Sequence, residues 1–268
     1  MSRADRAERV LAYLDEKGAA TYRALQPLLE VSEMTVRRDV DRLAQEGRLI
    51  KTLGGAQKAN APADFYESSF LARISSNLRE KRAIAQKAFE GIEPEESLSV
   101  DGSSTCLELA RILAKADKRL TVVTNSLLVS QEVGRNKGNT VLMLGGQYDP
   151  ETHCVSGPTS EAQMAQYHVD SAYISTKGLL PTEGTYESSV GLFRIKQIMA
   201  ARSRKVVLLA DHSKFGQRAL SKVLDIAQIH CVITDSADDE TLSSLEKAGV
   251  TVLIAKPQPR EAQPQNAP

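Results

Sequence analysis

The sequence lacks any apolar run near the roughly 18 to 20 residues that a membrane-spanning helix needs. It also lacks an N-terminal stretch with the charged, apolar and small-residue order of a signal peptide. These two absences predict a cytoplasmic protein that has no membrane partner.

Cysteine is scarce, and Cys106, Cys154 and Cys231 lie far apart in the sequence. A zinc site needs closely spaced pairs of ligands. His153 precedes Cys154, but no second pair accompanies them. The sequence therefore predicts reduced thiols, no metal site and no cofactor.

A surplus of positive charge is missing too, because 34 lysines and arginines balance 34 aspartates and glutamates. A net charge of zero does not exclude DNA binding, which depends on a local basic face. Six basic residues do gather in one stretch, namely Arg37, Arg38, Arg42, Arg48, Lys51 and Lys58. Because Asp39, Asp41 and Glu46 share that stretch, we expect a modest, salt-sensitive affinity for non-specific DNA.

The most informative residues form the second half of a predicted helix-turn-helix. Val36, Val40 and Leu43 recur at i, i+4 and i+7, the spacing of one buried helical stripe. Ser32 precedes them as an N-cap, and Glu33 suits the positive end of the helix dipole. Two helices are predicted before this one, at 6–17 and from Thr21 to Leu29. Pro27 lies inside the second, which we expect to be kinked or short.

The predicted third helix is equipped for a DNA major groove. Arg38 points away from the apolar stripe, Arg37 flanks the stripe, and Thr35 and Arg42 lie nearer Arg38. Arginine can pair with guanine, and threonine can contact a phosphate or a thymine methyl. A short strand and a glycine turn then form a wing that places Lys51 near the DNA backbone. The predicted DNA-binding residues are Ser32, Met34, Thr35, Arg37, Arg38, Arg42, Lys51, Gly54 and Gly55.

Over residues 6–56, the sequence VSEMTVRRDVDRLAQEGRL and the following GGA resemble the DeoR family of bacterial sugar-metabolism regulators. That family has a serine before the recognition helix, a Thr-hydrophobic-Arg-Arg-Asp run and a Gly-Gly-Ala wing. The resemblance implies a DNA-binding winged helix. The alternative is a winged helix that binds protein.

The length suits one small and one medium domain. We expect the winged helix at 1–58, a linker at 59–77, an α/β domain at 78–255 and a disordered tail at 256–268. The larger domain alternates short β-branched runs with helices, which predicts a mostly parallel, Rossmann-like sheet covered by helices. Strands are predicted at 97–100, 120–124, 140–144, 172–175, 205–210, 231–234 and 250–254. Helices are predicted at 81–89, 105–113, 127–133, 159–167, 193–202 and 241–248.

Small polar residues follow five of the predicted strands. Ligands of open α/β sheets bind at the carboxyl ends of strands. The loop Asp101-Gly102-Ser103-Ser104-Thr105 also opens a helix, whose amides and dipole can hold a phosphate. The predicted effector-binding residues are Asp101, Gly102, Ser103, Ser104, Thr105, Thr124, Asn125, Gly145, Gly146, Lys177, Gly178, Asp211 and Lys214.

This half also resembles the DeoR family, in the pieces VDGSSTCLELA, VVTNS, LGG, Ser156-Gly157-Pro158, Glu183-Gly184 and LLADHSKFG. The resemblance implies a fold like that of sugar-phosphate isomerases and a phosphorylated sugar as effector. It also implies a phosphate cradle at 102–105, with Lys214 as a nearby cation.

Two loops depart from the family pattern. The common Asp-Ser-Gly-Thr-Thr is Asp101-Gly102-Ser103-Ser104-Thr105 here, so the glycine has moved. Gly-Ala-Asp-Gly is replaced by Ser175-Thr176-Lys177-Gly178. The added lysine suggests an effector with a second anionic group.

The main hypothesis is a repressor of carbohydrate-metabolism genes, controlled by a phosphorylated sugar. A single winged helix contacts few base pairs, so we expect a homo-oligomer, a dimer or tetramer, on a symmetric operator of double-stranded DNA. One alternative is a sugar-phosphate isomerase with a DNA-binding appendage, whose base would be Asp101, Glu183, Glu187 or Asp211. Against an isomerase, the loop at 175–178 lacks the carboxylate that isomerases resembling this fold have there. We interpret His212 as a hydrogen-bonded structural residue. The other alternative is a protein-interaction module.

Overall fold

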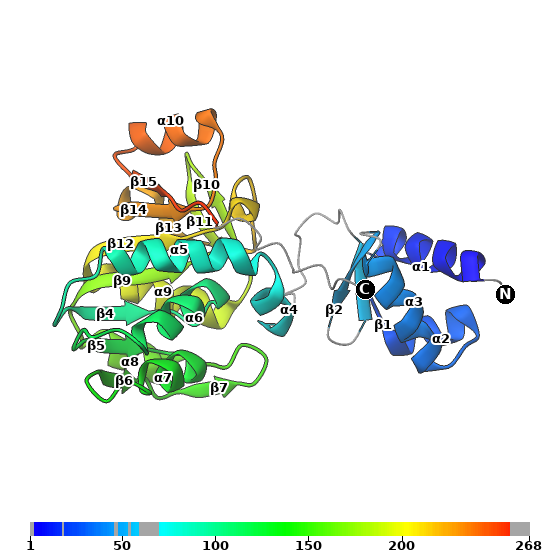
Figure 1. Cartoon of the computed structure of the whole chain (residues 1–268), viewed down its shortest axis with the longest axis horizontal. Coiled ribbons are helices and arrows are strands. Elements are labelled where there is room, and N and C mark those ends of the chain that lie inside the picture. Colours follow the sequence, from blue (N-terminus) through cyan, green and yellow to red (C-terminus); the bar gives the residue numbers. More distant parts are fainter. Residues whose placement is uncertain (1–2, 18, 46–47, 53–54, 59–69, 258–268) are drawn as a thin grey trace, which may run out of the picture. The chain divides into compact units, whose positions relative to one another are not determined.

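The computed structural model describes residues 3–17, 19–45, 48–52, 55–58 and 70–257. The chain divides into two compact units, Met1–Ser76 and Asn77–Pro268, called here the N-terminal and C-terminal units (Figure 1). None of the helices in the described ranges is both long enough and apolar enough to span a bilayer.

The N-terminal unit packs three helices against a small sheet. Its elements are α1 (Arg3–Lys17), β1 (Ala19–Thr21), α2 (Tyr22–Leu29), α3 (Glu33–Gln45), β2 (Leu49–Thr52) and β3 (Gly55–Lys58). The strands pair antiparallel in the order β1-β3-β2. Val36, Val40 and Leu43 are fully buried in the core with apolar side chains from α1 and α2. The predicted winged helix-turn-helix is thus confirmed.

Helix α2 shows how local sequence sets its ends. The Thr21 hydroxyl accepts from the Ala24 amide over 3.1 Å, and Glu30 ends the helix with a left-handed φ of 54°. Pro27 lies inside this helix, which has only eight residues. Of the two predicted outcomes, a short helix is the one observed.

Two contacts that the sequence did not reveal hold the N-terminal unit together. Asp39, one of the three acidic residues in the basic stretch, is 3% exposed and accepts from Arg6 Nε over 2.6 Å, which ties α3 to α1. Arg6 compensates the charge of this buried carboxylate. Gly55 is buried, and a Cβ there would lie 1.9 Å from the Ala20 carbonyl oxygen, so the β1–β3 pairing itself requires glycine.

The C-terminal unit is built on a parallel seven-stranded sheet in the order β15-β14-β12-β9-β4-β5-β6. Its strands are β4 (Ser97–Val100), β5 (Thr121–Thr124), β6 (Thr140–Met143), β9 (Val169–Ser175), β12 (Ser203–Leu209), β14 (Cys231–Thr234) and β15 (Thr251–Ile254). All seven overlap predicted strands. The predicted parallel α/β class is confirmed.

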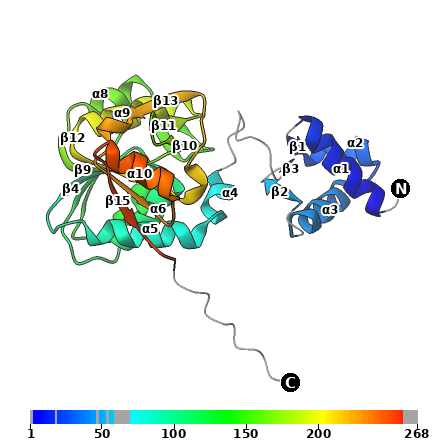
Figure 2. The ribbon, with the colours of Figure 1, turned by 90° about the horizontal axis from the view of Figure 1, so that it is seen from above.

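Helices cover both faces of this sheet (Figure 2). On one face α5 (Leu78–Glu90), α6 (Ser104–Leu113) and α7 (Leu127–Val133) pack side by side. On the other lie α8 (Pro158–Met164) and α9 (Val190–Ala201), while α10 (Asp239–Lys247) packs against β15. Burial on both faces agrees with the buried residues of the central strands, such as Leu98–Val100 of β4 and Val206–Leu209 of β12.

Two small antiparallel sheets were missed by the sequence analysis. One is the hairpin of β7 (Gln147–Asp149) and β8 (Cys154–Ser156). The other joins β10 (Gly178–Leu180), β11 (Gly184–Glu187) and β13 (Ser221–Asp225). Strands this short show no period-2 pattern. Two single-turn helices, η1 (His212–Lys214) and η2 (Ile226–Gln228), follow β12 and β13.

The edges of the units differ from the predicted boundaries. Helix α4 (Phe70–Ser75) lies within the stretch assigned to the linker. Residues 59–69 and 258–268, which hold the rest of that linker and most of the predicted tail, lie outside the described residues.

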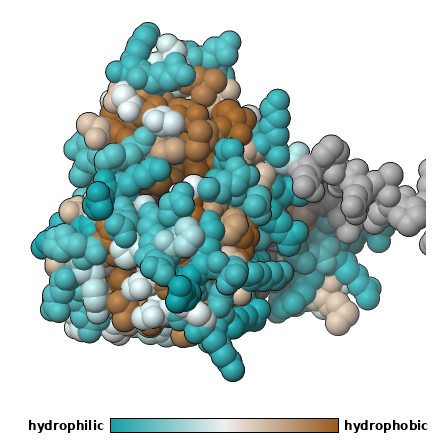
Figure 3. All heavy atoms as spheres, turned by 60° about the vertical axis from the view of Figure 1, so that its left-hand side comes forward, coloured by the Kyte–Doolittle hydropathy of each residue, from teal (hydrophilic) through white to brown (hydrophobic). Residues whose placement is uncertain are grey.

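The sheet ends at β15, which has β14 as its one neighbour in the described part of the chain. Figure 3 shows a hydrophilic surface on α10 and an apolar area below it, at the level of these two strands. Ile254 is exposed there, and Val252 and Leu253 are half-buried.

Candidate functional site

On α3, Arg38 is the residue best placed to contact a partner. Its side chain is exposed, and it has no ion pair or hydrogen bond within the described residues. Met34, one turn earlier, is 65% exposed. Thr35 is half-buried, and its hydroxyl lies 3.1 Å from that of Ser32. These residues form the outer surface of α3, opposite the buried stripe.

The other predicted DNA-binding side chains have partners inside the N-terminal unit. Arg37 donates to Glu33 over 2.7 Å, and its guanidinium lies 5.0 Å from the centre of the Tyr22 ring. Lys51 is exposed and pairs with Asp41.

Arg42, one turn after Arg38, is less exposed than Arg38. It is half-buried and lies 3.9 Å from the buried Asp39, so its charge is partly compensated within the N-terminal unit. Gly54 lies outside the described residues. Arg38 is therefore the cation of α3 that is ready for a guanine without breaking a contact first.

The second candidate site lies at the carboxyl edge of the large sheet. β12, β9, β4, β5 and β6 are consecutive neighbours, and they are followed or ended by Asp211, Ser175, Asp101, Asn125 and Gly145. The five predicted strand ends therefore meet along one edge. The chain order reverses between β4 and β9, which is where ligands of such sheets bind.

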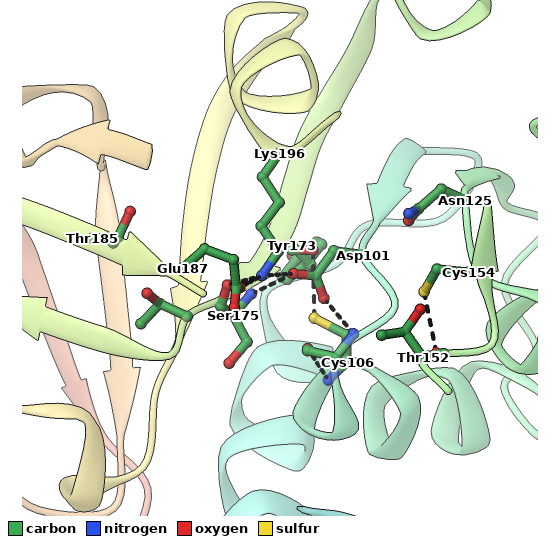
Figure 4. A network of polar contacts seen from close by, with 12 residues as sticks. Asp101, Cys106, Asn125, Thr152, Cys154, Tyr173, Ser175, Thr185, Glu187 and Lys196 are labelled. Carbon is green, nitrogen blue, oxygen red and sulfur yellow. Dashed lines mark hydrogen bonds and ion pairs between the residues drawn. The ribbon is translucent and has the colours of Figure 1, made fainter. Parts of the chain in front are cut away.

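Asp101 organises the centre of this edge (Figure 4). It is 1% exposed; Oδ1 accepts from the Ser103 amide and Oδ2 from the Ser175 amide, each over 2.9 Å. The Asp101 carboxylate thus fixes the loop after β4 against the end of β9. Because both Asp101 oxygens accept from backbone amides of the protein, the carboxylate holds the loop in position.

Lys196, on α9, is the functional residue that sequence reasoning missed. Its buried ammonium donates to the Ser175 carbonyl oxygen over 2.9 Å, forms an ion pair with Glu187 and lies 3.4 Å from Asp101 (Figure 4). The only local signal was a lysine inside an otherwise mostly apolar helix. Asp101, Glu187 and Lys196 are called here the buried triad.

Electrostatics keep Asp101 and Lys196 of this triad charged. Burial alone would raise the pKa of Asp101, but the Lys196 charge and hydrogen bonds from Ser103 and Ser175 outweigh it and lower that pKa. Burial would lower the pKa of Lys196, yet Glu187 and Asp101 together raise it. Asp101 is therefore ionised at neutral pH, so it cannot donate a proton to a ligand.

The loop above Asp101 opens α6. Ser103 is the N-cap, and its hydroxyl accepts from the Cys106 amide over 3.2 Å. Ser104 and Thr105 follow in the first turn, where backbone amides have no intrahelical acceptor. Those amides and the positive end of the helix dipole suit an anion.

The displaced glycine of this loop has a packing cause. A Cβ on Gly102 would lie 2.1 Å from Cys154 Sγ, which belongs to β8. β8 is in turn held at the end of β5, because the Val155 amide donates to the Asn125 carbonyl over 2.8 Å. The β7–β8 hairpin thus packs against the loop at Gly102, the one residue of the loop that has no side chain.

We expect Gly102→Ala to destabilise the C-terminal unit by about 1–3 kcal/mol, the usual cost of overpacking. The same substitution in a Cys154→Ala background should cost less, because the clashing sulfur is gone. Urea unfolding of the four proteins measures this coupling. Gly91→Ala is the control, since its Cβ would find its nearest neighbour 3.7 Å away. If Gly102→Ala lowered the free energy of unfolding equally in the wild-type and Cys154→Ala proteins, the contact between residue 102 and Cys154 would be contradicted.

Asn125, after β5, has spare hydrogen-bonding capacity. It is 1% exposed; Nδ2 donates to the Val155 carbonyl, while Oδ1 has no partner within the described residues. A buried acceptor without a donor is costly, so a ligand donor there would be favoured. Thr124 instead serves the backbone, because its hydroxyl accepts from the Ser126 amide.

At the ends of β6 and β9, the glycines predicted to bind the effector lie in close contact with other parts of the protein. A Cβ on Gly146, whose φ is 149°, would lie 2.1 Å from Ser160 Oγ. Gly145 donates its amide to Gln163. Gly178 lies against the Gln217 backbone, and a Cβ there would be 2.2 Å from its carbonyl oxygen. Lys177 is half-buried, and its amide donates to Tyr186.

At the β12 end, Asp211 is fully buried and unevenly used. Oδ1 accepts from the Ser213 amide and from Asn77 Nδ2, each over 3.0 Å, whereas Oδ2 has no partner in the described ranges. Burial would raise the pKa of Asp211, but Lys214 and these hydrogen bonds lower it. An ionised carboxylate with a free oxygen remains beside Lys214.

His212 has a structural role, as its sequence context suggested. Its Nδ1 lies 2.6 Å from Asp235 Oδ2, and its amide donates to the same carboxylate. The bond to Asp235 raises the pKa of His212. No group of histidine, cysteine or acidic residues in the described ranges could hold a metal ion, and Cys106, Cys154 and Cys231 are buried free thiols.

Comparison with known proteins covers both units. Residues 6–61 match the DeoR-like helix-turn-helix domain, and residues 76–236 match the DeoR C terminal sensor domain. The uncharacterised HTH-type transcriptional regulator YulB of Bacillus subtilis is 30% identical over 250 residues, which cover 93% of this chain and 95% of the relative. The HTH-type transcriptional repressor GlcR of the same organism is 27% identical, covering 96% and 98% of the two chains.

A solved structure, ribose 5 phosphate isomerase A from Neisseria gonorrhoeae, aligns with a TM-score of 0.39 at 20% identity and covers 52% of this chain and 53% of its own. The matches to both domains and the nearly full-length relatives select the regulator over the isomerase. The chain belongs to the DeoR family of transcriptional regulators.

Proposed function

We propose that this regulator is a repressor of carbohydrate-metabolism genes whose operator binding is controlled by a phosphorylated sugar. One observation carries the proposal: the first turn of α6 shares a sheet edge with two buried acceptors, on Asn125 and Asp211, that have no hydrogen-bond donor among the described residues. The helix start suits an anion, and the acceptors suit hydroxyl groups. A sugar phosphate carries both.

Each group has a distinct role in this proposal. The amides and hydroxyls of Ser104 and Thr105 hold the phosphate, and Asp101 keeps their loop in place through the Ser103 amide. Asn125 and Asp211 accept from sugar hydroxyls. Lys214, which lowers the pKa of Asp211, supplies a cation nearby. Lys177 suits a second anionic group on the effector.

The assembly and location are part of the same proposal. A winged helix has one recognition helix, so a dimer or tetramer on a symmetric operator is needed for useful selectivity. The chain would act where the chromosome lies, which in a bacterium is the cytoplasm. Repression is favoured by the name of the relative GlcR.

We expect Thr105→Val and Lys214→Ala each to weaken sugar-phosphate binding roughly 10- to 100-fold, the loss of a hydrogen bond to a charged group. Operator affinity without effector should stay near the wild-type value, because neither residue lies in the N-terminal unit. Calorimetry with fructose 6-phosphate, ribose 5-phosphate and glycerol 3-phosphate, paired with titration of the DNA upstream of the gene, measures both quantities. The proposal fails if none of the three compounds binds.

The surroundings of three of the four candidate bases do not suit isomerisation. Asp101 and Glu187 are tied to Lys196, and Glu183 pairs with Arg218 and accepts from Tyr186. A general base must reach the proton that it removes. We expect no turnover of aldose or ketose phosphates by the purified chain.

A further inference from the structure

One residue links the Asp211 end of the proposed site to the place where the chain enters the C-terminal unit. Asn77 is the first residue of that unit. Its Nδ2 donates to Asp211 Oδ1 over 3.0 Å and lies 3.4 Å from Ser213 Oγ. The entry point is therefore hydrogen-bonded directly to a residue proposed to touch the effector.

Asn77 makes this bond from an uncommon backbone conformation. Its φ of 48° and ψ of 38° are left-handed, a region that asparagine tolerates better than most residues. Asn77 is also the N-cap of α5, yet its side chain makes no cap hydrogen bond. Asparagine is among the best N-caps when its backbone is extended. Asn77 gives up that arrangement to reach Asp211.

An asparagine at an N-cap can therefore take two arrangements. In the observed one, the backbone is left-handed and the amide lies on Asp211. In the other, the backbone is extended and the side-chain oxygen accepts from the first-turn amides of α5. Because φ and ψ at Asn77 set the direction in which the preceding chain leaves α5, the two arrangements direct that chain differently.

A ligand bound at Asp211 can change which of the two Asn77 arrangements is favoured. Its Oδ1 accepts from Asn77 and from both the amide and the hydroxyl of Ser213, while its buried Oδ2 has no partner in the described residues. A ligand hydroxyl on Oδ2 would fix how the carboxylate is turned, and hence the acceptor that Asn77 meets. The ligand would then bind the two arrangements with different affinities, which is the condition for shifting their populations.

We propose that Asn77 is the positioning residue through which effector occupancy at Asp211 sets the path of the chain toward the DNA-binding unit. The inference rests on the proposed effector site and adds the route by which its occupancy is transmitted.

The test compares full-length wild type, Asn77→Gly and Asn136→Gly. Glycine keeps the left-handed backbone accessible but removes the amide. Asn136 is the control, since it loses a comparable bond, to the Ala116 carbonyl, away from the carboxyl edge of the sheet. The affinity for DNA from upstream of the gene is titrated with and without a saturating sugar phosphate. The phosphate used is the tightest wild-type binder among fructose 6-phosphate, ribose 5-phosphate and glycerol 3-phosphate.

The ratio of the two DNA affinities measures the coupling between the sites. In Asn77→Gly we expect this ratio to shrink by about fivefold or more toward one, while Asn136→Gly keeps the wild-type ratio. Hydrogen exchange at the first turn of α5 should respond to the sugar phosphate in wild type and not in Asn77→Gly. A purely structural role would lower stability without changing the ratio.

Two results would overturn the inference. A wild-type ratio in Asn77→Gly, with sugar phosphate still binding, removes Asn77 from the route and leaves the proposed function intact. Failure of wild type to bind all three sugar phosphates contradicts the proposed function, and the inference falls with it.

Discussion

Replacing Lys196 by methionine is expected to destabilise the C-terminal unit by about 3–5 kcal/mol, the cost of leaving buried charges without their partner. The ammonium lies 3.4 Å from Asp101, pairs with Glu187 and donates to the Ser175 carbonyl oxygen. Methionine fills similar space but cannot compensate either carboxylate. Urea unfolding at neutral pH measures the loss. Lys205→Met, an exposed lysine on β12, is the control and should change stability little.

The pH dependence identifies the cause of that loss. In wild type the pKa of Asp101 is lowered, so its contribution is present above its unfolded value of about 3.9 and is lost as pH falls below it. Without Lys196, burial dominates and raises the pKa of Asp101, so the variant gains stability as pH falls through that raised value. The difference between the two proteins should therefore shrink from pH 7 to pH 4. A constant difference would indicate lost packing instead.

Arg38→Ala is expected to weaken operator binding about 5- to 150-fold while affecting random DNA much less, since one bidentate guanine contact supplies about 1–3 kcal/mol of discrimination. Arg38 is exposed and unpaired within the described residues, so its loss should leave the fold unchanged. Competition titrations with operator and random duplexes at one salt concentration measure the two losses.

Two further variants make this test specific. Lys51→Ala should weaken binding to operator and to random DNA by the same factor, because a phosphate contact has no base preference. Arg37→Ala should have a smaller effect on operator than Arg38→Ala, because Arg37 must first leave Glu33 and the Tyr22 ring. Equal losses on the two DNAs for Arg38→Ala would reduce that residue to a phosphate contact.

Local patterns were enough to predict much of this architecture. The i, i+4, i+7 stripe of α3 was identified because helical periodicity is a property of neighbouring residues. The polar ends of β4, β5 and β12 were identified because a parallel sheet brings its carboxyl ends to one edge. Short antiparallel strands such as β10 and β13 escaped, since they have no period-2 pattern and lie outside the regular alternation of strands and helices that identified the parallel strands.

The remaining features depend on contacts between distant residues. Asp39 was counted among the acidic residues of the basic stretch, and only the fold reveals its contact with Arg6 of α1. Lys196 gained its role from Asp101 and Glu187, and Asp101 comes near it only because β4 pairs with β9 in the sheet. Asn77 was assigned to the linker, because no neighbouring residue in the sequence indicates its hydrogen bond to Asp211. Such pairings are invisible to any window of neighbouring residues.

The position of β4 in the middle of the sheet has a consequence for the order of synthesis. β4 can pair with β5 early, but its other neighbour, β9, emerges only after β6 and the β7–β8 hairpin. Non-local pairing slows folding, whereas the short-range contacts of the N-terminal unit favour speed. Domains also tend to fold in the order of their synthesis. On the ribosome, the proposed recognition helix is therefore expected to be complete while the sheet that holds the proposed effector site is still unfinished.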